Sequence, residues 1–285
     1  MREYNIRELK EKEIKRGIKV LYSSFCRTIT GNQINIETKN WKMLMENGFG
    51  RFLISELEGN IIGIGGVFLF EDVCSFGYMG VLPHYRGEGI GTQIFGNLFE
   101  IAVDLGCKKM ILYASTLGEP IYKKFGFLKS YYGSMYLLPR TLPKLGSGNK
   151  KVKVLNHLPN WLLDLDKETT GFDRAEYFKL KLDLGSMVLV VENEAFGFVS
   201  KVLTNLRLGP LISKNLDSAL KIIKKSIALK ANQIIITEHK SLPKKILELV
   251  GLTKVENGSS LRMTYGDVIL ENLDLIYAIG TFAKS

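Results

Sequence analysis

Hydrophobic positions in the first half of the chain alternate between the spacing of strands and the spacing of helices. Two apolar runs, Arg51–Leu57 and Ile61–Phe70, flank Glu58-Gly59-Asn60 and predict a β-hairpin with glycine in its turn. From Glu88 to Leu105, apolar residues recur every three or four positions, which predicts an amphipathic helix. The other expected elements are helices at Lys10–Phe25 and Glu119–Phe125 and strands at Val73–Leu82, Lys109–Ala114 and Phe127–Leu138.

A similar order of helix, hairpin, helix, strand, helix and strand returns in the second half. Helices are expected at Trp161–Leu165, Arg174–Lys181, Asn215–Leu229 and Leu242–Val250, and strands at Ser186–Val191, Ala195–Leu203, Ile234–Thr237 and Ser260–Tyr265. The segment from Pro139 to Lys151 is rich in Pro, Gly, Ser and Asn, which is typical of a linker. We therefore expect two α+β units with mixed sheets, residues 1–140 and 152–285, joined by a linker at 141–151 and related by an internal duplication.

Composition excludes several classes of protein. With 46% hydrophobic and 24% charged residues, the chain is too apolar to be disordered. No apolar run approaches the roughly 20 residues of a membrane helix, and the N-terminus lacks the apolar core of a secretory signal. A cytoplasmic protein with no membrane partner is expected.

The formal net charge is +10, and it divides equally between residues 1–148 and the remainder. Such a surplus favours anionic ligands of several kinds. A nucleic-acid partner is not expected, because no basic stripe with interleaved aromatic residues is present.

Cysteine and histidine are scarce. Cys26, Cys74 and Cys107 are odd in number and form no C-x-x-C pair, so neither a disulfide framework nor a zinc ribbon is expected. Cys74 is instead expected to be a packing residue. Three scattered histidines give no reason to expect a metal site.

A glycine-rich turn follows the strand that ends at Pro83. The run Arg86-Gly87-Glu88-Gly89-Ile90-Gly91-Thr92 opens the amphipathic helix, whose first N–H groups have no intrahelical acceptor. Glycines would let a phosphate approach these amides, and Arg86 adds positive charge, so the turn predicts a cradle for pyrophosphate. Thr92 stands where a Rossmann fingerprint needs its third glycine, and no Gly-Lys dipeptide supports a Walker A loop. A turn that merely caps a core helix is the alternative.

The R-x-x-G-x-G pattern formed by Arg86, Gly89 and Gly91 resembles the coenzyme-A signature of the GNAT acetyltransferase superfamily. A second feature agrees, because Ala114-Ser115-Thr116 is followed by Tyr122, four residues ahead of Gly126-Phe127. The resemblance covers about residues 50–138. It implies a GNAT-like acyl-CoA N-acyltransferase fold in which acetyl-CoA lies where the fourth and fifth strands separate. The second half resembles the divergent C-terminal GNAT-like domain of some two-domain members, which implies a tandem pair of folds. That second resemblance rests on Gly171-Phe172-Asp173-Arg174, Leu208-Gly209-Pro210-Leu211-Ile212-Ser213 and Arg262-Met263-Thr264-Tyr265-Gly266.

The resemblance also implies roles for individual residues. The strand segment Met79, Gly80 and Val81 would pair with the pantetheine arm, and Ser115 would lie against it. The pyrophosphate would be held by Arg86 and by the amides of Gly87, Glu88, Gly89, Ile90, Gly91 and Thr92. Tyr122 would be the general acid that protonates the coenzyme-A thiolate, or else an ordinary core residue.

No general base is assigned in this way. The fourth strand offers only Ser75 and Tyr78, and Met110 stands where some family members carry a glutamate. The remaining groups are nearby turn or edge residues, namely Glu56, Glu71, Asp72 and His84, or a water chain that ends at Tyr78.

The second half lacks the R-x-x-G-x-G pattern, so a substrate-binding or scaffolding role is expected for it. Asp173, Arg174 and Tyr265 are candidates for lining an acceptor cleft between the halves.

The function expected from this resemblance is N-acetylation by direct attack of an amine on acetyl-CoA, without a metal. The amine would belong to a small molecule or to a protein. A coenzyme-A-binding sensor or regulatory module without turnover is the alternative. The sequence leaves both a monomer and a homodimer open.

Overall fold

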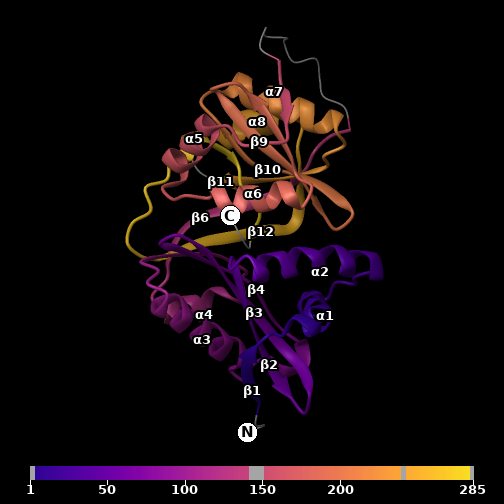
Figure 1. The fold of residues 1–285 in the computed structure, drawn as a ribbon, viewed down its shortest axis with the longest axis vertical. Coiled ribbons are helices and arrows are strands. Elements are labelled where there is room, and N and C mark those ends of the chain that lie inside the picture. The colour runs from indigo at the N-terminus through magenta and orange to yellow at the C-terminus, as the bar shows by residue number, and fades with distance from the viewer. Residues whose placement is uncertain (1–3, 141–150, 239–241, 283–285) are drawn as a thin grey trace.

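The computed structural model describes residues 4–140, 151–238 and 242–282. Within these residues, thirteen strands form one mixed sheet that runs through both halves of the chain in the order β1-β2-β3-β4-β5-β12-β6-β11-β10-β9-β8-β7, with β13 paired to β10 (Figure 1). The strands are β1 Asn5–Glu8, β2 Gly50–Leu57, β3 Asn60–Phe70, β4 Val73–Val81, β5 Lys109–Ala114, β6 Leu128–Leu137, β7 Lys153–Leu155, β8 Met187–Val191, β9 Ala195–Val202, β10 Asn205–Ser213, β11 Gln233–Glu238, β12 Thr253–Gly266 and β13 Ile276–Ala278.

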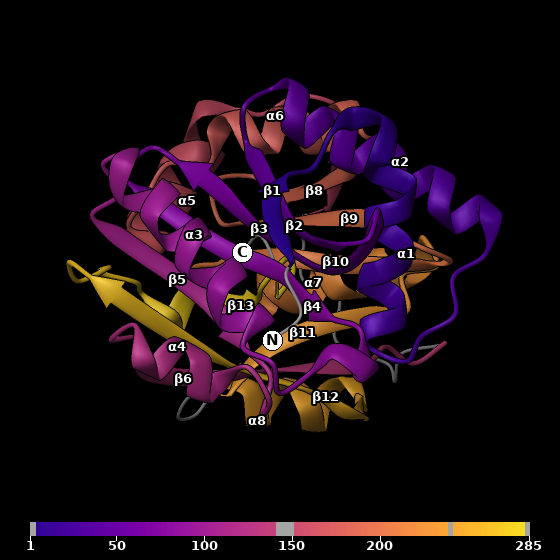
Figure 2. The ribbon, with the colours of Figure 1, turned by 90° about the horizontal axis from the view of Figure 1, so that it is seen from below.

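Helices cover both faces of this sheet. They are α1 Ile14–Ser24, α2 Gly31–Glu46, α3 Ile90–Asp104, α4 Glu119–Lys124, α5 Asn160–Thr170, α6 Ala175–Asp183, α7 Leu216–Ala228 and α8 Leu242–Val250, with short 3₁₀ turns at Glu11–Glu13, Pro83–Tyr85 and Leu273–Leu275. Figure 2 shows α1 and α2 on one side of strands β1–β4 and α3 and α4 on the other. The fold is thus α+β with a mixed sheet, as the sequence predicts, but one sheet runs through both halves.

The two halves exchange strands at the centre of the sheet. Strand β12, from the second half, lies between β5 and β6, so that Leu261 is opposite both Ala114 and Tyr132. Strand β6, from the first half, pairs in turn with β11, where Leu137 is opposite Gln233. Each half therefore completes its sheet with a strand of the other. Residues 141–150 of the expected linker lie outside the described residues, and the expected domain boundaries stay a prediction.

One hydrophobic core joins the halves. It takes buried side chains from α1 and α2 of the first half and from α5 and α6 of the second. The ring of Phe70 at the end of β3 lies 5.5 Å from that of Tyr177 on α6. Separate cores form under α3 and α4 and under α7 and α8. Helices α1, α2, α5 and α6 therefore share one core.

The expectation of a chain without disulfides is wrong. Cys74 in β4 and Cys107, just before β5, form a disulfide with their Cα atoms 6.0 Å apart. The two strands run parallel at this point, which brings together cysteines that are 33 residues apart in sequence. Cys26 is free and exposed. No helix in the part of the chain that the structure describes is long and apolar enough to span a membrane.

Candidate active site

Strands β4 and β5 separate half-way along β4. Their parallel pairing extends from Val73 opposite Lys109 to Phe76 opposite Leu112 and then stops. From Gly77 onward, β4 pairs only with β3, so within the described residues its other edge has no strand partner. The unpaired edge contains Met79, Gly80 and Val81. These main-chain groups can therefore accept an extended ligand in the manner of an added strand.

The glycine-rich turn lies directly at the end of this opening. Gly87 and Gly89 both have φ of +84°, and Gly89 is the N-cap of α3, with no side-chain cap. A Cβ atom added to either glycine would meet no atom within 4 Å. The two glycines therefore leave open space beside the turn into α3, and the first N–H groups of that helix, those of Ile90, Gly91 and Thr92, precede its first intrahelical donor, Gln93. This arrangement fits the expected anion cradle.

Arg86 holds the end of β4 against the end of α1. Its Nε donates to the carbonyl oxygen of Val81 at 3.1 Å, and its Nη2 donates to the carbonyl oxygen of Ser24. The side chain remains exposed next to Gly87 and Glu88. Arg86 thus adds its charge beside the cradle and also joins two elements, a role that its sequence position alone does not reveal.

Gly80 allows a close approach of α1 to β4. A Cβ atom at this position would lie 2.1 Å from Oγ of Ser24, so no larger residue fits without moving the helix.

Ser115 and Tyr122 lie close to each other at the end of β5. Oγ of Ser115 accepts from the N–H of Gly118 at 3.2 Å, in the turn that leads into α4. Tyr122 is 6% exposed, and its ring packs edge-on against Phe95 of α3 at 4.7 Å. A Cβ atom at Gly118 would lie 3.3 Å from the Tyr122 hydroxyl and 3.4 Å from Oγ of Ser115. Burial raises the pKa of Tyr122 above its ordinary value, so the phenol stays protonated at neutral pH.

The corresponding opening in the second half is filled by the chain itself. Strands β10 and β11 pair only at Arg207 and Leu208, and β13 then enters between them. Leu211 pairs with Ala278 on one side, while Ile279 forms a bridge to Ile235 on the other.

The helix that follows β10 also differs from α3. The side chain of Asn215 caps α7 by accepting from the N–H of Ser218 at 2.9 Å, so one helix-end donor is already used.

Comparisons with known proteins match both halves to one family. The model of the acetyltransferase (GNAT) family matches residues 20–127, and a second model, of an acetyltransferase (GNAT) domain, matches residues 162–278. The chain belongs to the GNAT acetyltransferase family.

Two solved structures resemble the whole chain. A Pyrococcus horikoshii protein described as a "putative acetyltransferase" shares 29% identity at a TM-score of 0.87, covering 99% of this chain and 96% of that one. A tandem GNAT protein from the clavulanic acid biosynthesis pathway has a TM-score of 0.64 at 12% identity, covering 93% of this chain and 98% of that one. These likenesses agree with a fold made of two GNAT domains.

A curated relative matches one GNAT domain in length. The Bacillus subtilis (strain 168) protein named "putative ribosomal protein bS18-alanine N-acetyltransferase" is 24% identical over 135 residues, which are 45% of this chain and 85% of that protein.

The groups considered as a general base from the sequence are dispersed by the fold. Glu56 forms an ion pair with Arg7 on β1, and Glu71 and His84 are exposed. Burial, and secondarily the negative charge of Glu37, hold the pKa of Tyr78 well above its usual range. The Tyr78 phenol therefore remains protonated near neutral pH.

The three candidates for lining the acceptor cleft do not come together. Arg174 is buried in an ion pair with Asp166, and Asp173 accepts from the N–H of Ala175 at 2.7 Å. Tyr265 packs against Phe99 of α3, in a different core.

Sequence reasoning missed two charged residues that lie within electrostatic range of Tyr78. Glu37 on α2 is 6% exposed, and Arg207 is on β10 of the second GNAT domain. The only sequence signal was a polar residue on the apolar face of α2, and α2 itself is not among the expected helices. No group of three His, Cys, Asp or Glu residues suited to a metal occurs in the ranges that the structure describes.

Proposed function

We propose that the first GNAT domain binds acetyl-CoA in the opening between β4 and β5 and transfers its acetyl group to an amine. The observation that carries this proposal is the separation of β4 from β5 after Phe76, with the glycine cradle at the N-terminus of α3 directly beyond it. A strand edge without a partner suits the pantetheine amides, and a helix N-terminus suits the pyrophosphate.

The chain's own groups then have separate tasks. A main-chain N–H on the free edge of β4 polarises the acetyl carbonyl and stabilises the oxyanion that forms when the amine attacks. Ser115 contacts the pantetheine arm, and the Tyr122 hydroxyl donates to the departing sulfur. Since burial makes Tyr122 a weaker acid than free tyrosine, its hydrogen bond to the sulfur contributes even before the proton transfers.

Calorimetric titration with acetyl-CoA tests cofactor binding. We expect one site per chain, because β13 and Asn215 occupy in the second domain the positions that the cofactor uses in the first. Two equivalent sites would contradict this assignment, and no binding would contradict the proposed function as a whole.

Release of coenzyme-A thiol in the presence of a panel of amines tests the transfer step. Binding without thiol release from any amine would favour the alternative, a coenzyme-A-binding sensor.

A further inference from the structure

Tyr78 is placed at the point where the opening begins. In the pairing of β3 with β4, Tyr78 and Met79 are together opposite Gly65, which makes a β-bulge, and Tyr78 has φ of +57°. Bulges redirect a side chain, and a positive φ at a non-glycine residue is unfavourable unless its surroundings maintain it. Here the ring of Tyr78 packs edge-on against Trp41 of α2 at 5.2 Å. The bulge thus directs the phenol away from the α3 side and towards α2.

Glu37 lies on the same face of α2, one helical turn before Trp41. The inward residues of α2 are Ile34, Glu37, Trp41 and Leu44, so a carboxylate occupies a core-facing position. Burial is the main cause of the raised pKa of two phenols, Tyr78 on β4 and Tyr22 on α1, and the negative charge of Glu37 is the second cause in both. Removal of a carboxylate from water is costly unless neighbouring polar or charged groups compensate it.

Arg207 of the second domain lies within electrostatic range of Glu37 and Tyr78. Its Nη2 donates to Oε1 of Gln233 at 3.1 Å, while its buried Nε has no acceptor within the described residues. Burial lowers the pKa of Arg207 to about 10, and the negative charge of Glu37 opposes that effect. Arg27, which is exposed after α1, adds a second positive charge. We call Glu37, Tyr22, Tyr78, Arg27 and Arg207 the acidic–basic cluster. This cluster combines one carboxylate with two guanidinium groups.

We propose that this cluster is the acceptor site, with Glu37 taking the proton of the acceptor ammonium and Arg207 binding an anionic group on the same acceptor. The acceptor is accordingly a primary amine that also carries a carboxylate or phosphate. This inference rests on the proposed function of the first domain.

The proton balance is complete with the groups named. One proton of the ammonium moves to Glu37, and the free amine attacks the acetyl carbon, forming the C–N bond. The C–S bond breaks as Tyr122 gives its proton to the sulfur. The nitrogen loses a second proton, which restores Tyr122 through solvent, and Glu37 releases its proton to water.

Matched pairs of amines test the anionic group with the wild-type protein. In each pair one member carries a carboxylate or phosphate and the other carries a neutral amide or hydroxyl in its place. We expect the anionic member to have at least a tenfold higher kcat/KM. Arg207→Gln should abolish this preference by raising KM for the anionic member, and Arg207→Lys should restore part of it. Equal use of both members, or an Arg207→Gln variant that keeps the preference, would overturn the role of Arg207.

The pH profile tests Glu37. In the wild type, kcat/KM should rise with pH and reach a plateau once Glu37 is ionised. The titratable and charged groups around Glu37 are Tyr22, Arg27, Tyr78 and Arg207. In Glu37→Gln it should be about 10²-fold lower at pH 7 and rise steadily with the fraction of free amine. Glu37→Asp should recover part of the plateau, and Glu46→Gln, an exposed carboxylate on the same helix, should match the wild type.

The two proposals fail in different ways. A Glu37→Gln variant that binds acetyl-CoA and keeps the wild-type pH profile would overturn the role of Glu37 alone. If Glu37→Gln does not fold, the pH profile of kcat/KM in the wild type tests the role of Glu37 instead. A steady rise without a plateau in that profile would overturn the role. Wild-type protein that binds acetyl-CoA but acetylates no amine would overturn the proposed function, and the acceptor site with it.

Discussion

Gly89 has a backbone conformation that other glycines of the fold share, but it alone caps the helix beside the opening. Its φ is +84° with open space around it, and Gly106 at the other end of α3 has φ of +76° with equally open space. Asparagine tolerates this conformation, so Gly89→Asn adds a side chain at modest backbone cost. We expect Gly89→Asn to weaken acetyl-CoA binding at least tenfold by crowding the phosphates, as measured by calorimetry.

Gly106→Asn is the matched control for that measurement and should bind acetyl-CoA as the wild type does. If both variants bind normally, the cradle is not at the N-terminus of α3.

A substitution at Tyr122 can distinguish an effect on catalysis from an effect on acetyl-CoA binding. Removing its hydroxyl leaves the ring packed on Phe95 and takes away only the hydrogen-bond donor. Tyr122→Phe should lower kcat about 10²-fold, the lower end of the range for general acid catalysis, with an unchanged Kd for acetyl-CoA. Steady-state kinetics together with calorimetry check this, and an unaltered kcat would remove Tyr122 from the reaction.

Site residues differ in how far the sequence could reveal them. The cradle residues from Arg86 to Thr92 are consecutive in sequence and form a single turn. A short stretch of sequence therefore suffices to predict anion binding there. Glu37 and Arg207 come within electrostatic range of each other only because the second domain shares a core with α2. No local spacing encodes that proximity.

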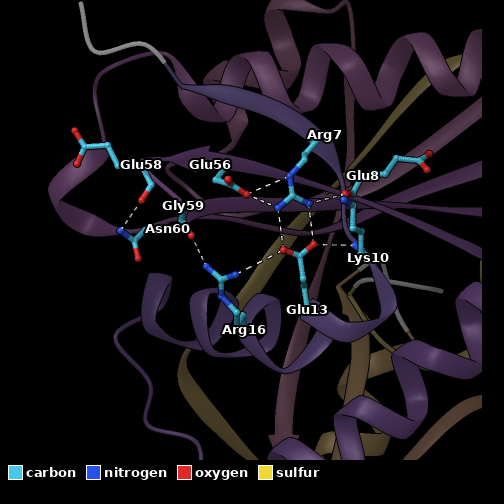
Figure 3. Close-up of polar contacts among 9 residues, drawn as sticks. All are labelled: Arg7, Glu8, Lys10, Glu13, Arg16, Glu56, Glu58, Gly59 and Asn60. Carbon is cyan, nitrogen blue, oxygen red and sulfur yellow. Dashed lines mark hydrogen bonds and ion pairs between the residues drawn. The ribbon is translucent and has the colours of Figure 1, made fainter.

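At the scale of elements, an ion-pair network attaches β1 and the start of α1 to β2 (Figure 3). Arg7 donates to both carboxylate oxygens of Glu13, at 2.7 and 2.8 Å, and also to Glu56 on β2. Glu13 further accepts from the N–H of Lys10 at 3.2 Å. The hydrogen bond from Arg7 is the main reason that the pKa of Glu13 falls from 4.5 to about 2.

This network predicts a specific acid sensitivity. A carboxyl group whose pKa is depressed in the folded state stabilises the fold above its unfolded pKa and loses that effect as the pH falls through its folded pKa. Between pH 5 and 2, we expect Glu13 to account for a loss of about 1–2 kcal/mol in the free energy of unfolding, after allowance for solvent screening. Urea unfolding at several pH values measures it. Glu13→Gln should flatten the dependence, whereas Glu58→Gln, in the exposed turn of the nearby hairpin, should leave it unchanged.

The pattern of apolar residues predicted most elements of the first domain but missed α2. The hairpin of β2 and β3, the strand β4 and the helix α3 lie where their periodicity indicated. Helix α2 begins with Gly31-Asn32, which favours a loop, and Glu37 interrupts its apolar face. Glu37, which obscures the helical pattern of α2 in the sequence, is thus also the residue that we propose as the general base.

Other misses have equally specific causes. Strand β10 contains Gly209-Pro210, a pair that usually ends a strand, and its Pro210 forms a cis peptide. The Cys74–Cys107 disulfide depends on the parallel pairing of β4 with β5, which sequence spacing does not provide.

At the scale of the whole molecule, the exchange of β6 and β12 makes the two GNAT domains interdependent. Without β12, strand β5 would expose one edge, and Leu261 and Met263 would be missing from the core beneath α3 and α4. Exposed strand edges and uncovered apolar surface promote aggregation. The sequence resemblance indicated two consecutive units, whereas the pairing of strands joins them into one sheet.

Expression of separate fragments tests this interdependence. We expect residues 1–140 alone to aggregate or to lack a cooperative thermal transition, because β5 and β6 have lost the strand that lies between them. Co-expression with residues 152–285 should restore a soluble complex with one copy of each fragment, in which β12 again pairs with β5. Size-exclusion chromatography and thermal unfolding followed by circular dichroism distinguish these states. A monomeric 1–140 fragment that unfolds cooperatively and binds acetyl-CoA like the whole chain would show that the exchanged strand is dispensable for the first domain.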